Sequence, residues 1–238
     1  MELKDISIAT MTWARSKGEE KTLRAALRIL ASLGAPVVAA DGGSPPAFIQ
    51  FMRRLRIEVV SPKGRGLVPQ IRESLQRAHD QFQTPFILYT EPDKAPFFAD
   101  NLTRFVGKCA PAASPAVFIP DRDRKSFATF PEGQRLTETF TNRITEALLG
   151  PKGDYTYGPL LMPRGLVASA REIPNSLGWG WRAFMLVRAV KKGLKLSHIR
   201  LPLPCPEDQR GENSQADQLY RARQLKQYLD ALLPALEK

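Results

Sequence analysis

The first hundred residues alternate between two spacings of apolar positions, one typical of strands and one of helices. Four short runs rich in apolar and β-branched residues predict strands at 5–11, 36–40, 57–60 and 85–90. Between them, apolar residues recur every three or four positions, which predicts helices over 22–33 and 68–82. Because strands and helices are interleaved, and the last strand is apolar nearly throughout, the pattern favours an α/β sheet covered on both faces.

The second half of the chain carries a weaker pattern of the same kind. It predicts strands at 116–119, 160–162 and 196–201, and helices at 136–149, 181–192 and 216–233. Pro202, Pro204 and Pro206 exclude a regular helix or central strand, so we expect a loop over 202–213. The sequence contains no internal repeat, low-complexity segment or linker, and its 238 residues fit a single α/β domain.

Composition narrows the class of protein further. A chain with 43% apolar and 25% charged residues is neither disordered nor fibrous. No apolar run approaches the roughly 18 residues that span a bilayer, and residues 1–5 lack the layout of a signal peptide. We therefore expect a soluble, cytoplasmic protein, in which Cys109 and Cys205 are reduced structural thiols.

The charge balance indicates an anionic partner. Lysine and arginine total 35 against 24 acidic residues, a formal net charge of +11. The candidates are nucleic acid, an acidic membrane surface and a phosphorylated small molecule. The sequence has no arginine-rich tail, aromatic-interleaved RNA motif or helix-turn-helix signature, so we expect no nucleic-acid partner.

Polar residues gather where the predicted strands end, which is where open α/β sheets bind their ligands. Glu91 and Asp93 follow the fourth strand, and two carboxylates at this spacing can jointly hold Mg²⁺ or Mn²⁺. An isolated Glu-x-Asp is more often only a solvated turn, so its context decides. The other polar residues at strand ends are Thr10, Thr12, Trp13, Asp41 and the Lys-Gly-Arg-Gly loop at 63–66.

Several of these segments, taken in order, resemble the motifs of GT-A-fold glycosyltransferases of the family 2 type. They are Ile-Ser-Ile-Ala-Thr at 6–10, Val-Val-Ala-Ala-Asp-Gly-Gly-Ser at 37–44, the loop at 63–66 and Ile-Leu-Tyr-Thr-Glu-Pro-Asp at 87–93. Residues 158–162 and 177–181 are similar to the family's acceptor side. The resemblance implies one GT-A-like domain with a mixed central sheet flanked by helices. It also implies a nucleotide-binding half at 1–100, an acceptor-side half at 101–215 and a C-terminal helix at 216–238.

The same resemblance implies roles for individual residues. Thr10, Thr12 and Asp41 would contact the nucleotide, and Glu91 and Asp93 would hold the metal and the diphosphate. Arg65, freed by its flanking glycines, would neutralise the diphosphate.

Three departures from the family pattern matter. Glu91 replaces the first aspartate of the Asp-x-Asp motif, and Asp41 has no second aspartate before Gly42. The acceptor segment lacks the carboxylate pair of many inverting members, because Trp-Arg-Ala-Phe stands at 181–184. The remaining acids that could act as the base are Asp154, Glu172, Glu207 and Asp208, of which we name Asp208 as a catalytic candidate beside Asp93. A retaining transferase would need no such base.

Three further residues are candidates for ligand contact. His198 is a possible third metal ligand, although a histidine packed in the core is the more frequent case. Trp179, between two glycines, is expected to stack on a sugar ring, and Trp181 is either a second such contact or a core residue.

We therefore predict a metal-dependent glycosyltransferase that moves a sugar from a nucleoside diphosphate donor to an unknown acceptor hydroxyl. The alternatives are a nucleotidyltransferase, although Thr-Met-Thr-Trp at 10–13 is not its glycine-rich loop, and a non-catalytic relative that binds a nucleotide or another anion. The helix at 216–233 has an apolar stripe and basic residues, and we expect it to pack on the domain. Membrane contact would then be weak and peripheral at most.

Overall fold

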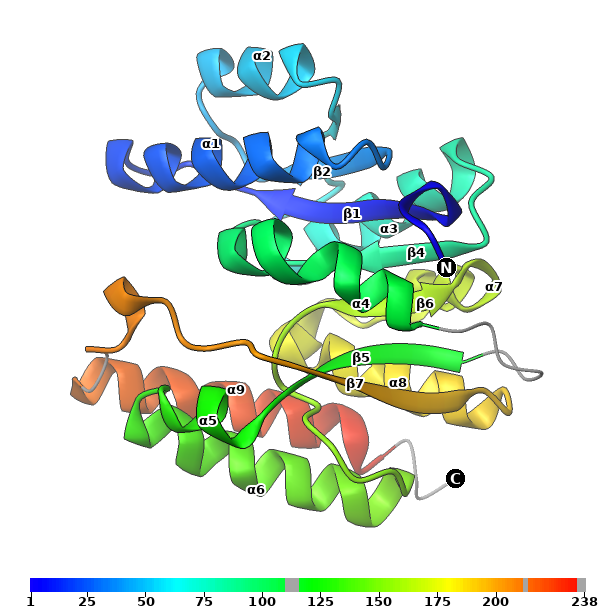
Figure 1. Ribbon diagram of the computed structural model, residues 1–238, viewed down its shortest axis with the longest axis vertical. Helices are drawn as coiled ribbons and strands as arrows, with labels where there is room; N and C mark the ends of the chain where they lie inside the picture. Colours follow the sequence, from blue (N-terminus) through cyan, green and yellow to red (C-terminus); the bar gives the residue numbers. More distant parts are fainter. Residues whose placement is uncertain (110–115, 212–213, 235–238) are drawn as a thin grey trace.

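A seven-stranded sheet runs through the computed structural model, which describes residues 1–109, 116–211 and 214–234 (Figure 1). The strand order is β3-β2-β1-β4-β6-β5-β7. The strands are β1 (Ile6–Thr12), β2 (Val37–Asp41), β3 (Glu58–Val60), β4 (Phe86–Tyr89), β5 (Ala116–Arg122), β6 (Leu160–Pro163) and β7 (Lys195–Leu201).

The sheet is mixed, as predicted. β1 pairs in parallel with β2 and β4, and β2 pairs in parallel with β3. β6 is antiparallel to both β4 and β5, whereas β5 and β7 are parallel. Because β1, β2 and β4 run in one direction, the segments that follow them meet at one edge of the sheet.

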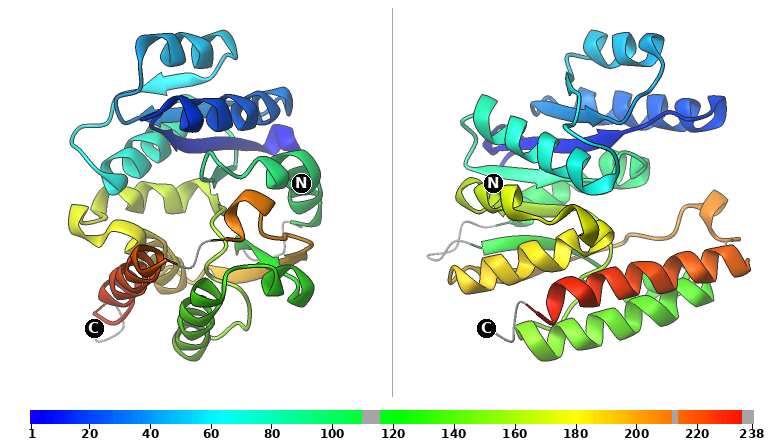
Figure 2. Two further views of the ribbon diagram at one scale, coloured as in Figure 1. Left: turned by 90° about the vertical axis from the view of Figure 1, so that its left-hand side faces the viewer. Right: turned by 180° about the vertical axis from the view of Figure 1, so that it is seen from behind.

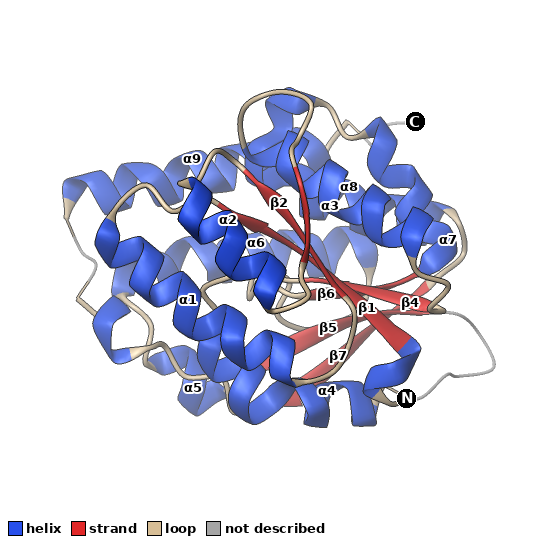
Figure 3. Ribbon diagram, turned by 90° about the horizontal axis from the view of Figure 1, so that it is seen from above, coloured by secondary structure: helices blue, strands red, loops and turns tan. Residues whose placement is uncertain are grey.

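Helices cover both faces of this sheet (Figure 3). One buried cluster joins α1, α2 and α4 to the sheet, and a second joins α3, α8 and α9 to the opposite face. The helices are α1 (Lys17–Ser32), α2 (Pro46–Arg54), α3 (Leu67–Gln81), α4 (Leu102–Lys108), α5 (Arg124–Ala128), α6 (Glu132–Leu149), α7 (Arg164–Val167), α8 (Trp181–Lys191) and α9 (Gln215–Leu232). Short 3-10 turns lie at Leu3–Asp5, Ala168–Glu172, Asn175–Gly180 and Glu207–Gln209, and a π-turn lies at Phe97–Asn101.

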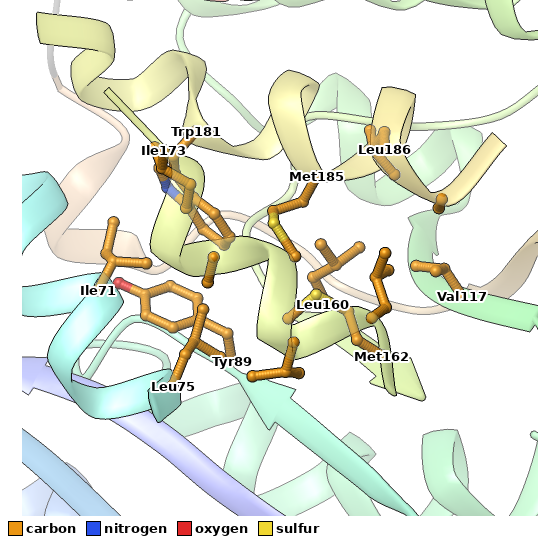
Figure 4. Packing of buried hydrophobic residues seen from close by; sticks show 14 of the residues in the cluster. Ile71, Leu75, Tyr89, Val117, Leu160, Met162, Ile173, Trp181, Met185 and Leu186 are labelled. Atoms are coloured by element: carbon orange, nitrogen blue, oxygen red, sulfur yellow. The ribbon is translucent and has the colours of Figure 1, made fainter. Parts of the chain in front are cut away.

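The α8 face of the core shows why this helix forms where it does. Trp181, Met185 and Leu186, spaced by four and one residues, point at the sheet and are fully or almost fully buried (Figure 4). The Trp181 ring meets the Tyr89 ring edge to face, with ring centroids 4.6 Å apart. Such contacts stabilise a buried aromatic pair beyond the burial of its apolar area.

The C-terminal helix packs on the domain, as we expected. α9 buries Tyr228, Ala231 and Leu232 and lies beside α6 (Figure 2, right). Among the described residues no helix combines the length and apolarity needed to cross a membrane. Weak peripheral membrane contact and a cytoplasmic location stay predictions.

The helices begin at other residues than the pattern predicts where a capping side chain or a proline fixes the start. α1 begins at Lys17, five residues before the expected start, because the Ser16 side chain accepts a hydrogen bond from the Glu19 amide. α6 begins directly after Pro131, and α2 begins at Pro46, where a proline is tolerated in the first turn. The pattern at 46–54 did not predict α2, although Phe48, Phe51 and Met52 share its buried face.

Candidate functional site

Two cavities meet at the segment that follows β4. The β1 cavity, of about 590 Å³, is lined by residues at and after the end of β1 and around the start of α3, among them Thr12, Trp13 and Gly66. The α6–α9 cavity, of about 400 Å³, lies between α6, α9 and the start of α8. Glu91, Asp93, Trp179 and Tyr220 line both cavities.

The predicted carboxylate pair therefore stands on the boundary between the two cavities. Glu91 is buried, with 7% of its surface exposed, whereas Asp93 is exposed. Burial raises the pKa of Glu91, against the opposing effect of the positive charges of Lys94 and Arg182. Lys94 lies close to both carboxylates: burial acts to lower its pKa, but Asp93 and Glu91 outweigh that effect and raise it.

A glycine makes room for Glu91. Gly158 has φ of 126°, in the left-handed region, and a Cβ there would lie 2.4 Å from the Glu91 Oε2 atom. Within the described part of the chain, Oε2 of Glu91 has no hydrogen-bond partner. The carboxylate is thus held close to the backbone, with Oε2 buried on the side of Gly158.

Glu91 and Asp93 are the residues that suit a divalent cation. Hard cations take oxygen ligands and often complete their shell with water and substrate phosphate oxygens, so two carboxylates at a cavity boundary fit Mg²⁺ or Mn²⁺. The described residues contain no group of three or more His, Cys, Asp or Glu side chains placed to hold a metal. A metal here would therefore depend on ligand oxygens for the rest of its shell.

Asp41 organises the loop after β2. Its Oδ1 accepts hydrogen bonds from Thr12 Oγ1 at 2.9 Å and Ser44 Oγ at 2.6 Å. Its Oδ2 accepts from the backbone amides of Gly43 at 2.9 Å and Ser44 at 2.7 Å. These four bonds use the acceptor capacity of the carboxylate, so a nucleotide base would have to replace one of them. Its direct contact with a nucleotide stays a prediction.

The other predicted nucleotide contacts differ in position. Thr12 lines the β1 cavity, and its hydroxyl is engaged by Asp41. Thr10 is fully buried in β1 and does not belong to the lining of either cavity. Arg65 is exposed on the loop before α3, whose Gly66 lines the β1 cavity with φ of 105°. Roles for Thr10 and Arg65 stay predictions.

Trp179 and Trp181 have different environments. Trp179 lines both cavities, and its backbone amide donates to Oε1 of Gln227 on α9 at 3.0 Å. Gly178 has φ of 51°, in the left-handed region that favours glycine, and a Cβ there would also lie 2.5 Å from that same oxygen. Trp181 is fully buried against Tyr89. It lines neither cavity, which is the core environment that the sequence left open for it, and a contact with a sugar stays a prediction.

His198 does not join the carboxylate pair. It lies in β7, its ring meets Tyr155 edge to face at 4.6 Å, and it lines neither cavity. Burial lowers its pKa, against the effects of Asp121 and Asp154. The structure thus places His198 outside the lining that contains Glu91 and Asp93, and its role as a metal ligand stays a prediction.

The acids named as possible catalytic bases do not lie together. Asp154 is buried in an ion pair with Arg122, and Glu172 pairs with Arg188 on the surface, so neither side chain is free near the carboxylate pair. Asp208 lies in the turn Glu207–Gln209, and its side chain falls outside the described part of the structure. Gln209 of the same turn lines the α6–α9 cavity.

Sequence reasoning missed the arginine at the start of α8. Arg182 follows the Gly-Trp-Gly segment and is buried, with 5% of its surface exposed, in the lining of the α6–α9 cavity. Its Nη1 lies 4.0 Å from the Glu91 Oε1 atom. The absence of an acid at 181–184 was visible in the sequence, but nothing there marked Arg182 as buried.

The order of the mixed sheet, the helices on both faces and the loops at the ends of β1, β2 and β4 define a GT-A-like fold, which confirms the predicted fold class. The chain is similar to crystal structures of glucosyl-3-phosphoglycerate synthase from Mycobacterium tuberculosis. In complex with Mn²⁺, UDP-glucose and phosphoglyceric acid, that protein matches with a TM-score of 0.70 and 18% identity, over 98% of this chain and 79% of that one.

Other complexes of the same enzyme agree. The complex with UDP gives a TM-score of 0.69, and that with Mn²⁺, UDP-glucose and glycerol 3-phosphate gives 0.68, both at 18% identity over 98% of this chain and 80% of that one. The sequence matches no protein-family model and no curated protein. At this identity the likeness establishes the fold.

Proposed function

We propose that this protein is a metal-dependent glycosyltransferase that transfers a sugar from a nucleoside diphosphate to an acceptor hydroxyl. The observation that carries the proposal is the pair Glu91 and Asp93 on the boundary between two cavities. Transfer requires a donor and an acceptor to meet at one point, and this boundary offers such a point. The similar synthase from M. tuberculosis binds UDP-glucose with Mn²⁺, which supports the same chemistry here.

The β1 cavity would hold the nucleotide. Trp13 offers an aromatic face at its wall, and the loop ordered by Asp41 lies beside Thr12. Glu91 and Asp93 would hold Mg²⁺ or Mn²⁺, which when bound stabilises the negative charge of the leaving diphosphate. Lys94, kept protonated by the two carboxylates, adds positive charge at the same place.

The sugar would then face the α6–α9 cavity across Trp179. Asp208 remains our candidate base for an inverting reaction, because its neighbour Gln209 lines that cavity. The hypothesis of a nucleotidyltransferase has less support, because that class needs a glycine-rich loop after β1 and this segment carries Trp13.

Calorimetric titration of UDP, with and without Mn²⁺, tests the metal-dependent donor site. We expect Mn²⁺ to strengthen UDP binding and Asp93→Asn to remove that gain. Asp100→Asn is the matched control, since Asp100 is exposed on the neighbouring π-turn Phe97–Asn101 and lines neither cavity. The proposal would be contradicted if Mn²⁺ did not change the affinity of the native protein for UDP. Release of UDP from a UDP-sugar would separate an active transferase from a non-catalytic binder.

A further inference from the structure

Two buried arginines line the α6–α9 cavity, and their surroundings are opposite. Arg122 is fully engaged: Nε donates to Asp154 at 2.5 Å, and Nη2 donates to Glu138 at 2.6 Å and to Thr156 at 2.9 Å. Arg182 is equally buried, yet none of its three guanidinium nitrogens has a hydrogen-bond partner in the described structure. Its guanidinium lies over the Trp181 ring, 5.8 Å from the centroid.

An unpartnered guanidinium in the interior is costly, because the charge has lost its water and has gained no acceptor. Glu91 is its ion-pair partner, and the 4.0 Å separation of Glu91 Oε1 from Arg182 Nη1 is too long for a hydrogen bond. Glu91 is also shared with Lys94 and, in our proposed function, with a divalent cation. When that cation is bound, Arg182 needs a negative charge from elsewhere.

The position of Arg182 indicates where that charge comes from. Arg182 lines the α6–α9 cavity but not the β1 cavity, where the nucleotide is proposed to bind. We propose that Arg182 binds a phosphate or carboxylate group of the acceptor, so that the acceptor is a small anionic molecule bearing a hydroxyl. This inference rests on the proposed function, because it takes the β1 cavity as the donor site.

The rest of the cavity fits such a ligand. Its volume of about 400 Å³ is that of a small-molecule site and does not suit a polymer. Its wall also offers neutral hydrogen-bonding groups, Gln134, Thr137 and Gln224, that suit hydroxyls. A guanidinium presents paired donors that match the two oxygens of a carboxylate or phosphate.

The test uses glycerol 3-phosphate as the anionic probe and glycerol as its uncharged counterpart. Binding of each is titrated to the protein alone and to the protein with UDP and Mn²⁺. We expect glycerol 3-phosphate to bind, and Arg182→Gln to weaken that binding about 10-fold to 100-fold. We expect glycerol not to bind. The UDP affinity of Arg182→Gln should remain within about 2-fold of the native value. Arg188→Gln is the matched control, since Arg188 lies on the same helix with its side chain partly exposed.

Thermal stability without ligand distinguishes a binding role from a structural one. Removing a buried guanidinium that makes no hydrogen bond should leave the melting temperature unchanged or raise it, whereas removing a structural arginine would lower it. Equal binding of glycerol 3-phosphate to the native protein and to Arg182→Gln, or no binding to either, would overturn the inference. A loss of UDP affinity alone in Arg182→Gln would also overturn it, and would assign Arg182 to the donor diphosphate.

The two proposals fail in different ways. If UDP binding ignores Mn²⁺ but glycerol 3-phosphate binds through Arg182, the proposed function fails and an anion site at Arg182 stands. If UDP binds with Mn²⁺ and the anionic probe does not depend on Arg182, the donor site stands and the acceptor inference fails.

Discussion

The buried carboxylate of Asp154 should make this protein sensitive to acid. Its Oδ2 accepts from Nε of Arg122 at 2.5 Å, and its Oδ1 accepts from Arg122 Nη2 at 3.1 Å and from Thr156 Oγ1 at 2.8 Å. Burial alone would raise the pKa of this carboxyl. The ion pair and hydrogen bonds outweigh burial and lower the pKa to about 2.

The size of this effect follows from linkage between protonation and folding. The pKa falls from its ordinary value of 3.8 to about 2, which corresponds to a stabilisation of about 2.5 kcal/mol. Because the folded-state pKa of Asp154 lies below the unfolded-state value, this stabilisation is fully present above about pH 4. It disappears as the pH falls from about 4 to 2.

Urea denaturation of Asp154→Asn tests the argument. At pH 7 we expect the free energy of unfolding to drop by at least about 2 kcal/mol, and the difference from the native protein to shrink below pH 4. Glu172→Gln is the control, because Glu172 pairs with Arg188 between side chains that are 55% and 39% exposed. Glu172→Gln should lower the free energy of unfolding by less than about 1 kcal/mol. The reasoning is refuted if Asp154→Asn is as stable as the native protein at pH 7, or if their difference does not change with pH.

Two further substitutions test the loops at the candidate site. Gly158→Ala should displace Glu91, since its Cβ would lie 2.4 Å from Oε2, and should reduce any sugar transfer about 100-fold in a rate assay. Gly165→Ala, at a position with nothing within 4 Å of the added carbon, should keep the native rate, and equal rates for both variants would contradict the account. Asp41→Ala should lower the free energy of unfolding in urea by about 1–3 kcal/mol, because four donors lose their acceptor. An unchanged urea midpoint would show that this hydrogen-bond network does not order the loop.

The sequence predicted the parts of this molecule whose signal is local. β1, β2 and β4 are short apolar runs that end in polar residues, and that pattern requires only burial on both faces of a sheet. The carboxylate pair was found for the same reason, because Glu91 and Asp93 directly follow such a run. Burial of Trp181 and the isolation of His198 depend on which distant segments pack together, and a one-dimensional pattern does not contain that information.

Arg182 shows the same limit in a sharper form. Sequence alone predicts that an arginine in the first turn of an amphipathic helix is solvated. Arg188, six residues further along the same helix, does have a partly exposed side chain. What buries Arg182 is the convergence of Glu91 from the end of β4 and of α9 from the end of the chain. The polar partners of Arg122, by contrast, lie on α6 and in the segment between α6 and β6. The two arginines of one cavity therefore have opposite environments.

The C-terminal helix connects both cavities physically. Tyr220 lines both of them, and Gln227 accepts the Trp179 amide while its backbone oxygen would lie 2.1 Å from a Cβ at Gly180. The glycine on that side of Trp179 is therefore required by the close approach of α9, and the backbone of Trp179 is fixed from the protein side before any ligand binds. The two cavities therefore share one wall, and a shift of α9 would change the lining of both cavities together.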